Sequence, residues 1–460
     1  MKKFLSSVLI VVMMGITLMG CSLNEEPETQ SQDSSENTET AQTENTGSEE
    51  IQELEGEITF WHSFTQGQRL DVIQKAADEF MQQNPKVNII IETYSWGDFY
   101  TKWTTGLASG NIPDISTALP GHVVEMIDAE ALMPLNDVVD AIGRNKFAEA
   151  TLGEGTLDGN NYSVPLYSHA QVMWYRKDLL DEAGIEVPTT WDEFYEAAVK
   201  LTTDDVYGIS VPTGSGDLMG TRFLNFYVRS GGGSLLTEDL KANLTSDLAI
   251  DGIKYWAKLY NETSPKDSVN YKVLDQANLF YQGKMAFDFN SGFHVGGIAN
   301  NSPDLLDDIS CAPIPKINAN DPEYGIETSN IPIVLWKNTE YPEIAKAFIE
   351  YIYNEDIYIE FLESVPVGML PAIAGIKDSE KYMENETIQQ FADEVDVISE
   401  AVGKGTAIGF EHGPSVEAGL LASQSIIENM FQSILVGGVD VETAAQKAED
   451  ELNESFEMMQ

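Results

Sequence analysis

The chain downstream of residue 56 repeats a pattern in which a short apolar run is followed by an amphipathic segment. The apolar runs are rich in β-branched and aromatic residues, which predicts strands, and the segments between them carry apolar residues at helical spacing. Strands are predicted at residues 57–61, 87–92, 113–115 and, further along, 207–212, and the first two helices at 69–83 and 98–108. The β-α-β-α-β order favours a parallel sheet, whose ligands bind beyond the carboxyl ends of its strands.

Each of the first three predicted strands runs into a loop that holds aromatic or hydrogen-bonding side chains. Aromatic rings stack on the C–H faces of sugars, and carboxylates, amides and imidazoles bind their hydroxyl groups. Core packing is the commoner role for any single aromatic residue, but three such loops at one sheet edge favour a carbohydrate site. The candidate ligand residues are His62, Thr65, Gln66, Trp96, Asp98, Gly121 and His122.

Residues 172–202 are predicted to form a strand, a short helix and a longer helix. The strand is the apolar run 172–175, and Gly184 is placed to cap the short helix. Thr190 and Glu193 have the spacing of a capping box, so the longer helix begins directly after Thr190. One face of that helix is apolar and consists of Phe194, Ala197, Ala198 and Leu201.

The residue order of this segment resembles the signature of family 1 extracellular solute-binding proteins of ABC importers, which include the maltose-binding protein. Arg176 departs from the signature, because the family usually has Asn or Asp there. The resemblance implies an α/β, two-lobed periplasmic-binding-protein-like fold with a three-crossing hinge, which closes on a ligand. The matching positions are Tyr175, Leu179, Leu180, Ala183, Gly184, Pro188, Thr190, Trp191, Asp192, Glu193, Phe194, Ala197, Ala198, Leu201 and Thr202.

The resemblance extends over residues 57–460 and implies limits for the two lobes. Lobe 1 is expected to comprise residues 57–168 and 317–366. Lobe 2 is expected to comprise residues 169–316 and 367–460.

The resemblance also implies ligand residues at the hinge and in lobe 2. His169 occupies the position from which the maltose-binding protein sends a ligand-contacting carboxylate, and a structural hinge histidine is the alternative reading. Asn290 and Phe293 lie where many members place a stacking aromatic residue, and Phe410 and His412 lie near the last binding aromatic. The expected partners are a small-molecule carbohydrate and the permease subunits of the importer. The receptor is expected to be a monomer without cofactor or metal.

The N-terminus has the pattern of an export signal. Lys2 and Lys3 precede an apolar run over 4–19, which is shorter than the roughly twenty residues of a spanning helix. The ending Leu18-Met19-Gly20-Cys21 resembles a bacterial lipobox, which predicts that residues 1–21 are a lipoprotein signal peptide and that Cys21 is lipidated; a non-lipidated signal is the alternative. Residues 22–56 are polar and predict a disordered acidic tether. The expected location is the extracellular face of the cell membrane, in a Gram-positive-type envelope.

The net charge of −49 argues against binding to nucleic acid or to an anionic membrane surface. Residues 22–56 contribute eleven acids and residues 1–21 two lysines, so −49 + 11 − 2 = −40 remains on the rest of the chain. This excess is typical of a solvated acidic surface. It also leaves open a second hypothesis, a receptor of the same family for a polyamine or another non-sugar solute.

The sequence lacks the motifs of common hydrolases, and no enzyme activity is predicted. There is no Gly-x-Ser-x-Gly and no His-Glu-x-x-His, and the five histidines are scattered along the chain. With 75 carboxylates, the choice of a glycosidase pair would be arbitrary. A surface carbohydrate-active enzyme is therefore the third hypothesis.

Overall fold

The computed structural model describes residues 53–65 and 68–459. The predictions for residues 1–21, and most of those for 22–56, lie outside the described residues. The residues from Glu53 onward form one unit of contacts. Within the part described, no helix is both long enough and apolar enough to cross a membrane.

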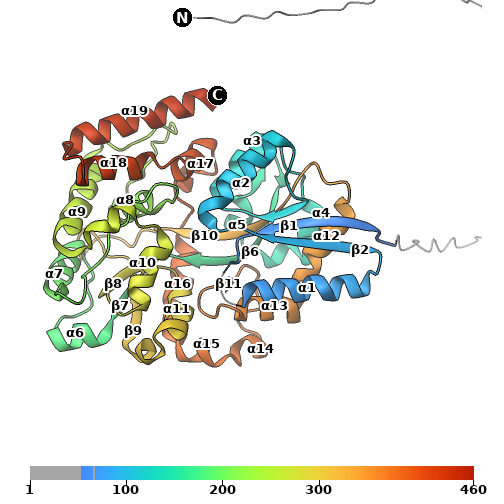
Figure 1. Ribbon diagram of the computed structural model, residues 1–460, viewed down its shortest axis with the longest axis horizontal. Coiled ribbons are helices and arrows are strands. Elements are labelled where there is room, and N and C mark those ends of the chain that lie inside the picture. Colours follow the sequence, from blue (N-terminus) through green and yellow to red (C-terminus); the bar gives the residue numbers. More distant parts are fainter. Residues whose placement is uncertain (1–52, 66–67, 460) are drawn as a thin grey trace, which may run out of the picture. The chain divides into compact units, whose positions relative to one another are not determined.

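Lobe 1 is built on a six-stranded sheet with the order β11-β6-β10-β3-β1-β2 (Figure 1). Strands β1, β2 and β3 are parallel, which confirms the predicted β-α-β-α-β arrangement, and β6, β10 and β11 add antiparallel pairs. The strands are β1 (Gly56–His62), β2 (Val87–Thr93), β3 (Ile115–Thr117), β6 (Ser163–Ala170), β10 (Thr328–Leu335) and β11 (Leu370–Pro371).

Helices cover both faces of this sheet because successive apolar side chains point to opposite sides of each strand. Phe60 packs in the cluster that holds helices α1 (Arg69–Gln83), α12 (Pro342–Ile352) and α13 (Glu355–Glu363). Its neighbour Trp61 packs in a second cluster with α2 (Trp96–Ser109) and α3 (Pro120–Asp128). The carboxyl end of β1 is thereby held between two layers of helices.

Lobe 2 has a smaller antiparallel sheet with the order β8-β7-β9. Its core is aromatic, with Trp191, Phe223, Trp256 and Phe289 in mutual ring contact. The strands are β7 (Val172–Arg176), β8 (Phe287–Asn290) and β9 (Ile309–Ala312), and the main helices are α7 (Trp191–Leu201), α8 (Met219–Ser230), α9 (Asp247–Thr263), α17 (Val416–Ser423), α18 (Ile426–Leu435) and α19 (Val441–Met459).

Short elements complete the two lobes. The remaining helices are α4 (Asn136–Ile142), α5 (Glu149–Gly153), α6 (Lys177–Ala183), α10 (Val273–Tyr281), α11 (Phe293–Asn301), α14 (Glu380–Met383), α15 (Glu386–Gln390) and α16 (Ala392–Lys404). A two-stranded sheet joins β4 (Thr156–Leu157) and β5 (Asn160–Asn161), and 3-10 turns occur at η1 (Arg144–Lys146), η2 (Lys266–Asn270), η3 (Pro303–Asp308) and η4 (Phe410–His412).

The lobes are joined by segments that leave one sheet and enter the other. Only Gln171 separates β6 from β7, and residues 313–327 lead from β9 back to β10. The third connection lies further along the chain than the limit predicted at 366, because β11 pairs with β6. Packing agrees with that pairing, since the lobe 1 core includes Met369, Ile373, Ile376, Tyr382 and Ile388.

The prediction of a strand at 207–212 is wrong. Only Tyr207 forms a bridge, with Met285. The following backbone is satisfied by hydroxyl groups at the end of α9, because Ser264 Oγ donates to the carbonyl of Ile209 at 2.8 Å and accepts the N–H of Val211 at 3.1 Å. Side-chain partners therefore replace the ladder that a strand would need.

The capping box predicted at the start of α7 is confirmed. Thr190 Oγ1 accepts the N–H of Glu193 at 3.3 Å, and Glu193 Oε2 accepts the N–H of Thr190 at 3.1 Å. We expect Thr190→Ala to lower the free energy of unfolding by about 1 kcal/mol, because a backbone donor loses its acceptor. Urea titration measures this loss. Thr105→Ala, at an exposed position inside α2, is the control and should cause no loss.

Candidate functional site

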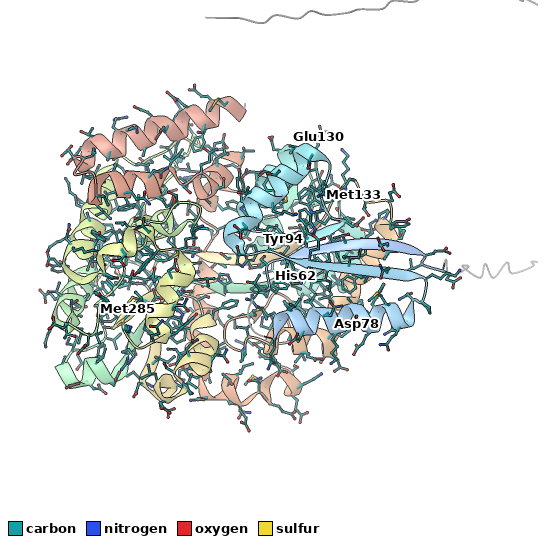
Figure 2. The ribbon with its side chains drawn as sticks, viewed as in Figure 1. His62, Asp78, Tyr94, Glu130, Met133 and Met285 are labelled. Carbon is teal, nitrogen blue, oxygen red and sulfur yellow. The ribbon has the colours of Figure 1, made fainter. Side chains whose placement is uncertain are left out.

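His62 ends β1 at the sheet edge that faces lobe 2, near Tyr94 at the end of β2 (Figure 2). Its side chain is buried, and Nδ1 accepts the N–H of Phe64 at 3.1 Å. The proton therefore sits on Nε2, which is buried and has no hydrogen-bond partner among the described residues. Burial, together with the charge of Arg69, lowers the pKa of His62 to about 3. The ring is thus a neutral donor whose N–H is not used within the described protein.

His169 presents a second neutral imidazole on β6. It pairs with Ser329 of β10, and its Nδ1 is buried without a partner among the described residues. Burial, followed by the charges of Arg222 and Arg69, lowers its pKa to about 3. Both histidines therefore stay uncharged at neutral pH and each retains an unused ring nitrogen.

Phe293, at the start of α11, is the lobe 2 residue that contacts His169. Its ring centroid lies 6.0 Å from that of His169 and 6.4 Å from that of Tyr167. The guanidinium carbon of Arg69 lies 5.0 Å from the Phe293 ring and 5.4 Å from the Phe64 ring. The Phe64 ring in turn stacks on His62 at 4.8 Å. We call this group the cleft cluster; it consists of His62, Phe64, Arg69, Tyr167, His169 and Phe293.

The backbone around Phe293 is fixed by contact with the third connection. A Cβ atom on Gly292 would lie 2.2 Å from the carbonyl oxygen of Val367, and one on Gly368 would lie 3.1 Å from Cα of Phe293. Only glycine allows this approach at 292. The nearby predicted residue Asn290 is buried, and its Oδ1 accepts the N–H of Ser291.

The first turn of α2 holds two predicted residues outside the cleft cluster. Trp96 is half-buried and its ring lies 5.8 Å from that of Phe99. Asp98 is exposed and accepts the hydroxyl of Ser95 at 2.6 Å. Thr65 is exposed as well. The predictions for Gln66 and Cys21 concern residues outside those described.

The four remaining predicted residues each have different surroundings. His122 is 6% exposed in the lobe 1 core, 5.2 Å from the ring of Tyr100, and burial lowers its pKa to about 4. Gly121 faces the backbone of lobe 2 and not open space. Phe410 is buried in the lobe 2 core, whereas His412 is exposed. The structure thus groups His62, His169 and Phe293, and does not show these four beside them.

The sequence analysis missed several residues of this region. Tyr167 could have been found from the two-residue period of β6, which places it on the same face as His169. Arg222 of α8 forms an ion pair with Glu327, with 2.7 Å between Nη2 and Oε1 and side-chain exposures of 12% and 2%. One turn along α8, both amide atoms of Asn225 are buried without a partner among the described residues. The period of α8 places Asn225 beside Arg222, but only tertiary structure shows its burial.

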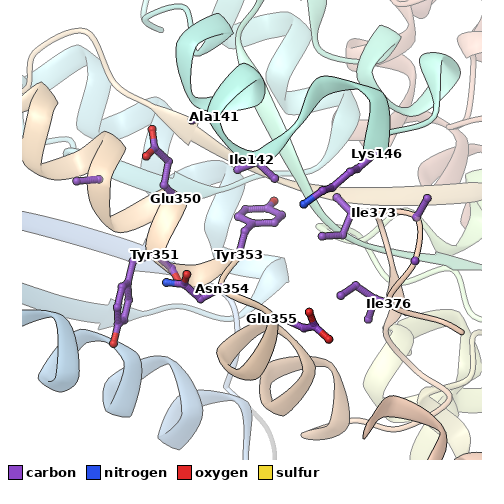
Figure 3. Close-up of a pocket in the computed structure, with 13 residues that line it drawn as sticks. Ala141, Ile142, Lys146, Glu350, Tyr351, Tyr353, Asn354, Glu355, Ile373 and Ile376 are labelled. Carbon is purple, nitrogen blue, oxygen red and sulfur yellow. The ribbon is translucent and has the colours of Figure 1, made fainter. Parts of the chain in front are cut away.

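A groove of about 740 Å³ lies elsewhere on lobe 1 (Figure 3). It is bounded by α4, α12 and the 373–376 loop, and its polar side chains include Lys146, Glu350 and Glu355. None of the predicted ligand residues lines it. The groove is therefore separate from the cleft cluster.

The described residues offer no group of three His, Cys, Asp or Glu side chains that could hold a metal ion. Cys311 is buried on β9, and burial raises the pKa of its thiol well above the ordinary range. A buried, protonated thiol is a poor nucleophile. The cleft cluster is therefore equipped for hydrogen bonding and ring stacking.

The chain thus has two α/β lobes that meet around the cleft cluster, which is the architecture of a two-lobed solute-binding protein. The family model for bacterial extracellular solute-binding protein matches residues 66–358, and the chain belongs to that family. Among its relatives, the arabinooligosaccharide-binding protein of Halalkalibacterium halodurans is 25% identical over 74% of this chain and 77% of the relative. The lactose-binding protein of Rhizobium radiobacter is also 25% identical, over 74% of this chain and 82% of the relative.

Solved structures agree with this fold. A solute-binding protein of an ABC transporter from Thermotoga lettingae, bound with α-D-tagatose, matches with a TM-score of 0.76 and 21% identity, over 86% of this chain and 99% of that one. The cycloalternan complex of a substrate-binding protein from Listeria monocytogenes matches with a TM-score of 0.71 and 20% identity, over 87% and 99%. The predicted α/β two-lobed fold is confirmed.

Proposed function

We propose that this chain is the receptor of an ABC importer that captures a neutral sugar, in the first instance an oligosaccharide, between its lobes. The observation that carries the proposal is the pair of neutral imidazoles in the cleft cluster. His169 contacts the Phe293 ring of lobe 2, and His62 is linked to that ring through Phe64 and Arg69. Each imidazole has a buried nitrogen without a partner among the described residues. Buried polar atoms are nearly always hydrogen-bonded, so a ligand hydroxyl is the natural partner.

The chemistry of the cleft cluster suits a sugar better than a polyamine. The cluster contains the Arg69 guanidinium, and Arg222 lies close enough to lower the pKa of His169. Positive groups repel a polycation, whereas a neutral polyol can use both the imidazoles and the ring face. The sugar ligands named for relatives and for neighbouring structures support the same class.

Capture needs no covalent step. Phe293 belongs to lobe 2, whereas His62 belongs to lobe 1, so a ligand can touch both only when the lobes are closed. Such a ligand has a higher affinity for the closed form and shifts the population toward it. The permease subunits would then accept the closed, loaded receptor.

The receptor would act at the outer face of the cell membrane, as a monomer anchored by a lipid on Cys21. The tether over residues 22–56 would let the two lobes reach the permeases. Metabolic labelling with palmitate tests the anchor. Label on the wild type and none on Cys21→Ala is the expected result, and equal label on both would contradict it.

Thermal shift tests the ligand class directly. We expect lactose, maltotriose or an arabinooligosaccharide at a hundredfold excess over its dissociation constant to stabilise the protein by about 2.7 kcal/mol, which raises the melting temperature by a few degrees. Spermidine is the control ligand. A shift with spermidine and none with any sugar would contradict the sugar proposal, and release of reducing ends would indicate an enzyme.

A further inference from the structure

A second contact between the lobes lies apart from the cleft cluster, where α3 of lobe 1 packs against α17 of lobe 2 (Figure 1). The two helix backbones touch at glycines. A Cβ atom on Gly419 would lie 2.8 Å from the carbonyl oxygen of Gly121, and one on Gly121 would lie 3.3 Å from Cα of Gly419. No larger residue at 419 allows this approach without moving a backbone.

A buried carboxyl group lies beside this crossing. Glu125 of α3 is 6% exposed, and its Oε1 accepts the hydroxyl of Ser423 from α17 at 3.1 Å. Its Oε2 accepts the hydroxyl of Tyr100 from α2 at 2.8 Å. The next residue on α3, Val124, packs against the lobe 2 core. The carboxyl is thus hydrogen-bonded to both lobes at once.

We propose that the Gly121–Gly419 crossing and the shared Glu125 carboxyl form a latch that stabilises the closed arrangement of the lobes. The proposal rests on the proposed function in one respect, since closure matters only if a ligand is captured between the lobes. The residues of the latch, Gly121, Glu125, Gly419 and Ser423, are distinct from those of the cleft cluster. The latch therefore sets ligand affinity through the closing equilibrium and not through a ligand contact.

The latch responds to protons because its carboxyl is buried. Burial raises the pKa of Glu125 to about 7, while the hydrogen bonds from Tyr100 and Ser423 act in the opposite direction. Separation of α17 would return water to the carboxyl, and its pKa would fall toward the ordinary value. The closed form then binds the proton more tightly, so closure gains as pH falls through 7 and loses as pH rises.

A second buried carboxyl lies near the latch, because Glu154 at the end of α5 lines a small cavity with Pro120 and Val123 of α3, and burial raises its pKa to about 7. On α3, burial lowers the pKa of His122 to about 4, and the remaining ionisable side chain, Asp128, is exposed at the end of the helix. On α2, burial raises the pKa of Tyr100 to about 12, so its hydroxyl stays protonated. The other ionisable side chains of the elements that pack on α3 are Asp98 and Lys102 of α2 and Glu417 of α17, and β10 has none.

Gly419→Ala tests the crossing, and Gly403→Ala is its matched control. Gly403 lies in α16, where an added Cβ meets nothing within 4 Å, so both variants gain the same helix propensity and only one forces the lobes apart. In ligand-free protein, we expect the backbone amide hydrogens of α3 and α17 to exchange with solvent about tenfold faster in Gly419→Ala than in wild type. Gly403→Ala should leave the exchange rate unchanged. Equal amide exchange rates in the two variants would contradict the proposal that the Gly121–Gly419 contact stabilises the closed arrangement.

The exchange measurement needs no ligand, so it separates the latch from the proposed function. If no sugar binds to any variant, the proposed function fails and the exchange result still decides the latch. If a sugar binds, Gly419→Ala should weaken its affinity about tenfold, because fewer molecules are closed. Ser423→Ala, which removes one hydroxyl and no backbone contact, should show a smaller loss in the same direction. Wild-type affinity in both would overturn the latch.

Glu125→Gln tests the carboxyl. The amide keeps an acceptor for the hydroxyl groups but carries no charge, so it imitates the protonated form. We expect the wild-type affinity for the sugar that gives a thermal shift to rise several-fold from pH 8 to pH 5.5. The variant should bind more tightly than wild type at pH 8 and show a much smaller rise, with the Glu154 carboxyl as the remaining contribution. A parallel pH dependence in the two proteins would overturn the role of Glu125.

Discussion

Replacement of Phe293 by alanine should weaken sugar binding by about 1–3 kcal/mol, or roughly 5- to 150-fold in dissociation constant. Phe293 is the lobe 2 member of the cleft cluster, and its ring lies 6.0 Å from His169 and 5.0 Å from the Arg69 guanidinium. Truncation removes an aromatic face that a sugar can cover. It also removes the side chain that joins the lobes on closure, so the closed form loses more than the open one.

The control for Phe293→Ala is an aromatic residue outside the cleft cluster. Tyr341, at the start of α12, is 36% exposed and serves this purpose. Isothermal titration should show the loss for Phe293→Ala and wild-type affinity for Tyr341→Ala. Unchanged affinity for Phe293→Ala, with both proteins folded by urea titration, would show that the ligand does not use this cluster.

The elements of lobe 1 could be predicted because local patterns and tertiary packing agree there. The helix predicted at 69–83 has the bounds of α1, and its residues Ile73, Ala77 and Phe80 are buried as the helical period requires. The capping box of Thr190 and Glu193 was equally local. Such features depend on residues a few positions apart, which the sequence displays directly.

The candidate site was harder to predict because two histidines near the ends of parallel strands have different environments. His62 ends β1 and lies in the cleft cluster, whereas His122 lies in the first turn of α3 and packs beside Tyr100 in the core. Only the tertiary contacts of the two rings distinguish them. Arg69 was missed because its role depends on tertiary contacts. Its guanidinium lies over the rings of Phe64 and of Phe293, which is distant in the sequence.

Removal of the Glu327 carboxylate should cost about 3–5 kcal/mol of unfolding free energy, because it leaves the buried Arg222 guanidinium without its counter-ion. Glu327 Oε1 and Oε2 each accept from Arg222 Nε at 2.9 Å. The Glu327 carbonyl also accepts the N–H of Gln171 at 3.1 Å, so the pair ties α8 to two of the connections between the lobes. Urea titration of Glu327→Ala measures the loss.

The matched control is an exposed ion pair, which likewise joins a basic side chain to a glutamate. Lys254 and Glu442 lie 2.6 Å apart, with side-chain exposures of 50% and 55%, and water screens them. Glu442→Ala should therefore cost less than about 1 kcal/mol. Replacement of both Arg222 and Glu327 by methionine should restore much of the stability lost in Glu327→Ala, because no charge is then left buried. A loss for Glu327→Ala no larger than for Glu442→Ala would show that the guanidinium finds water or another acceptor, and that the connection between the lobes is more open than the contacts of Glu327 indicate.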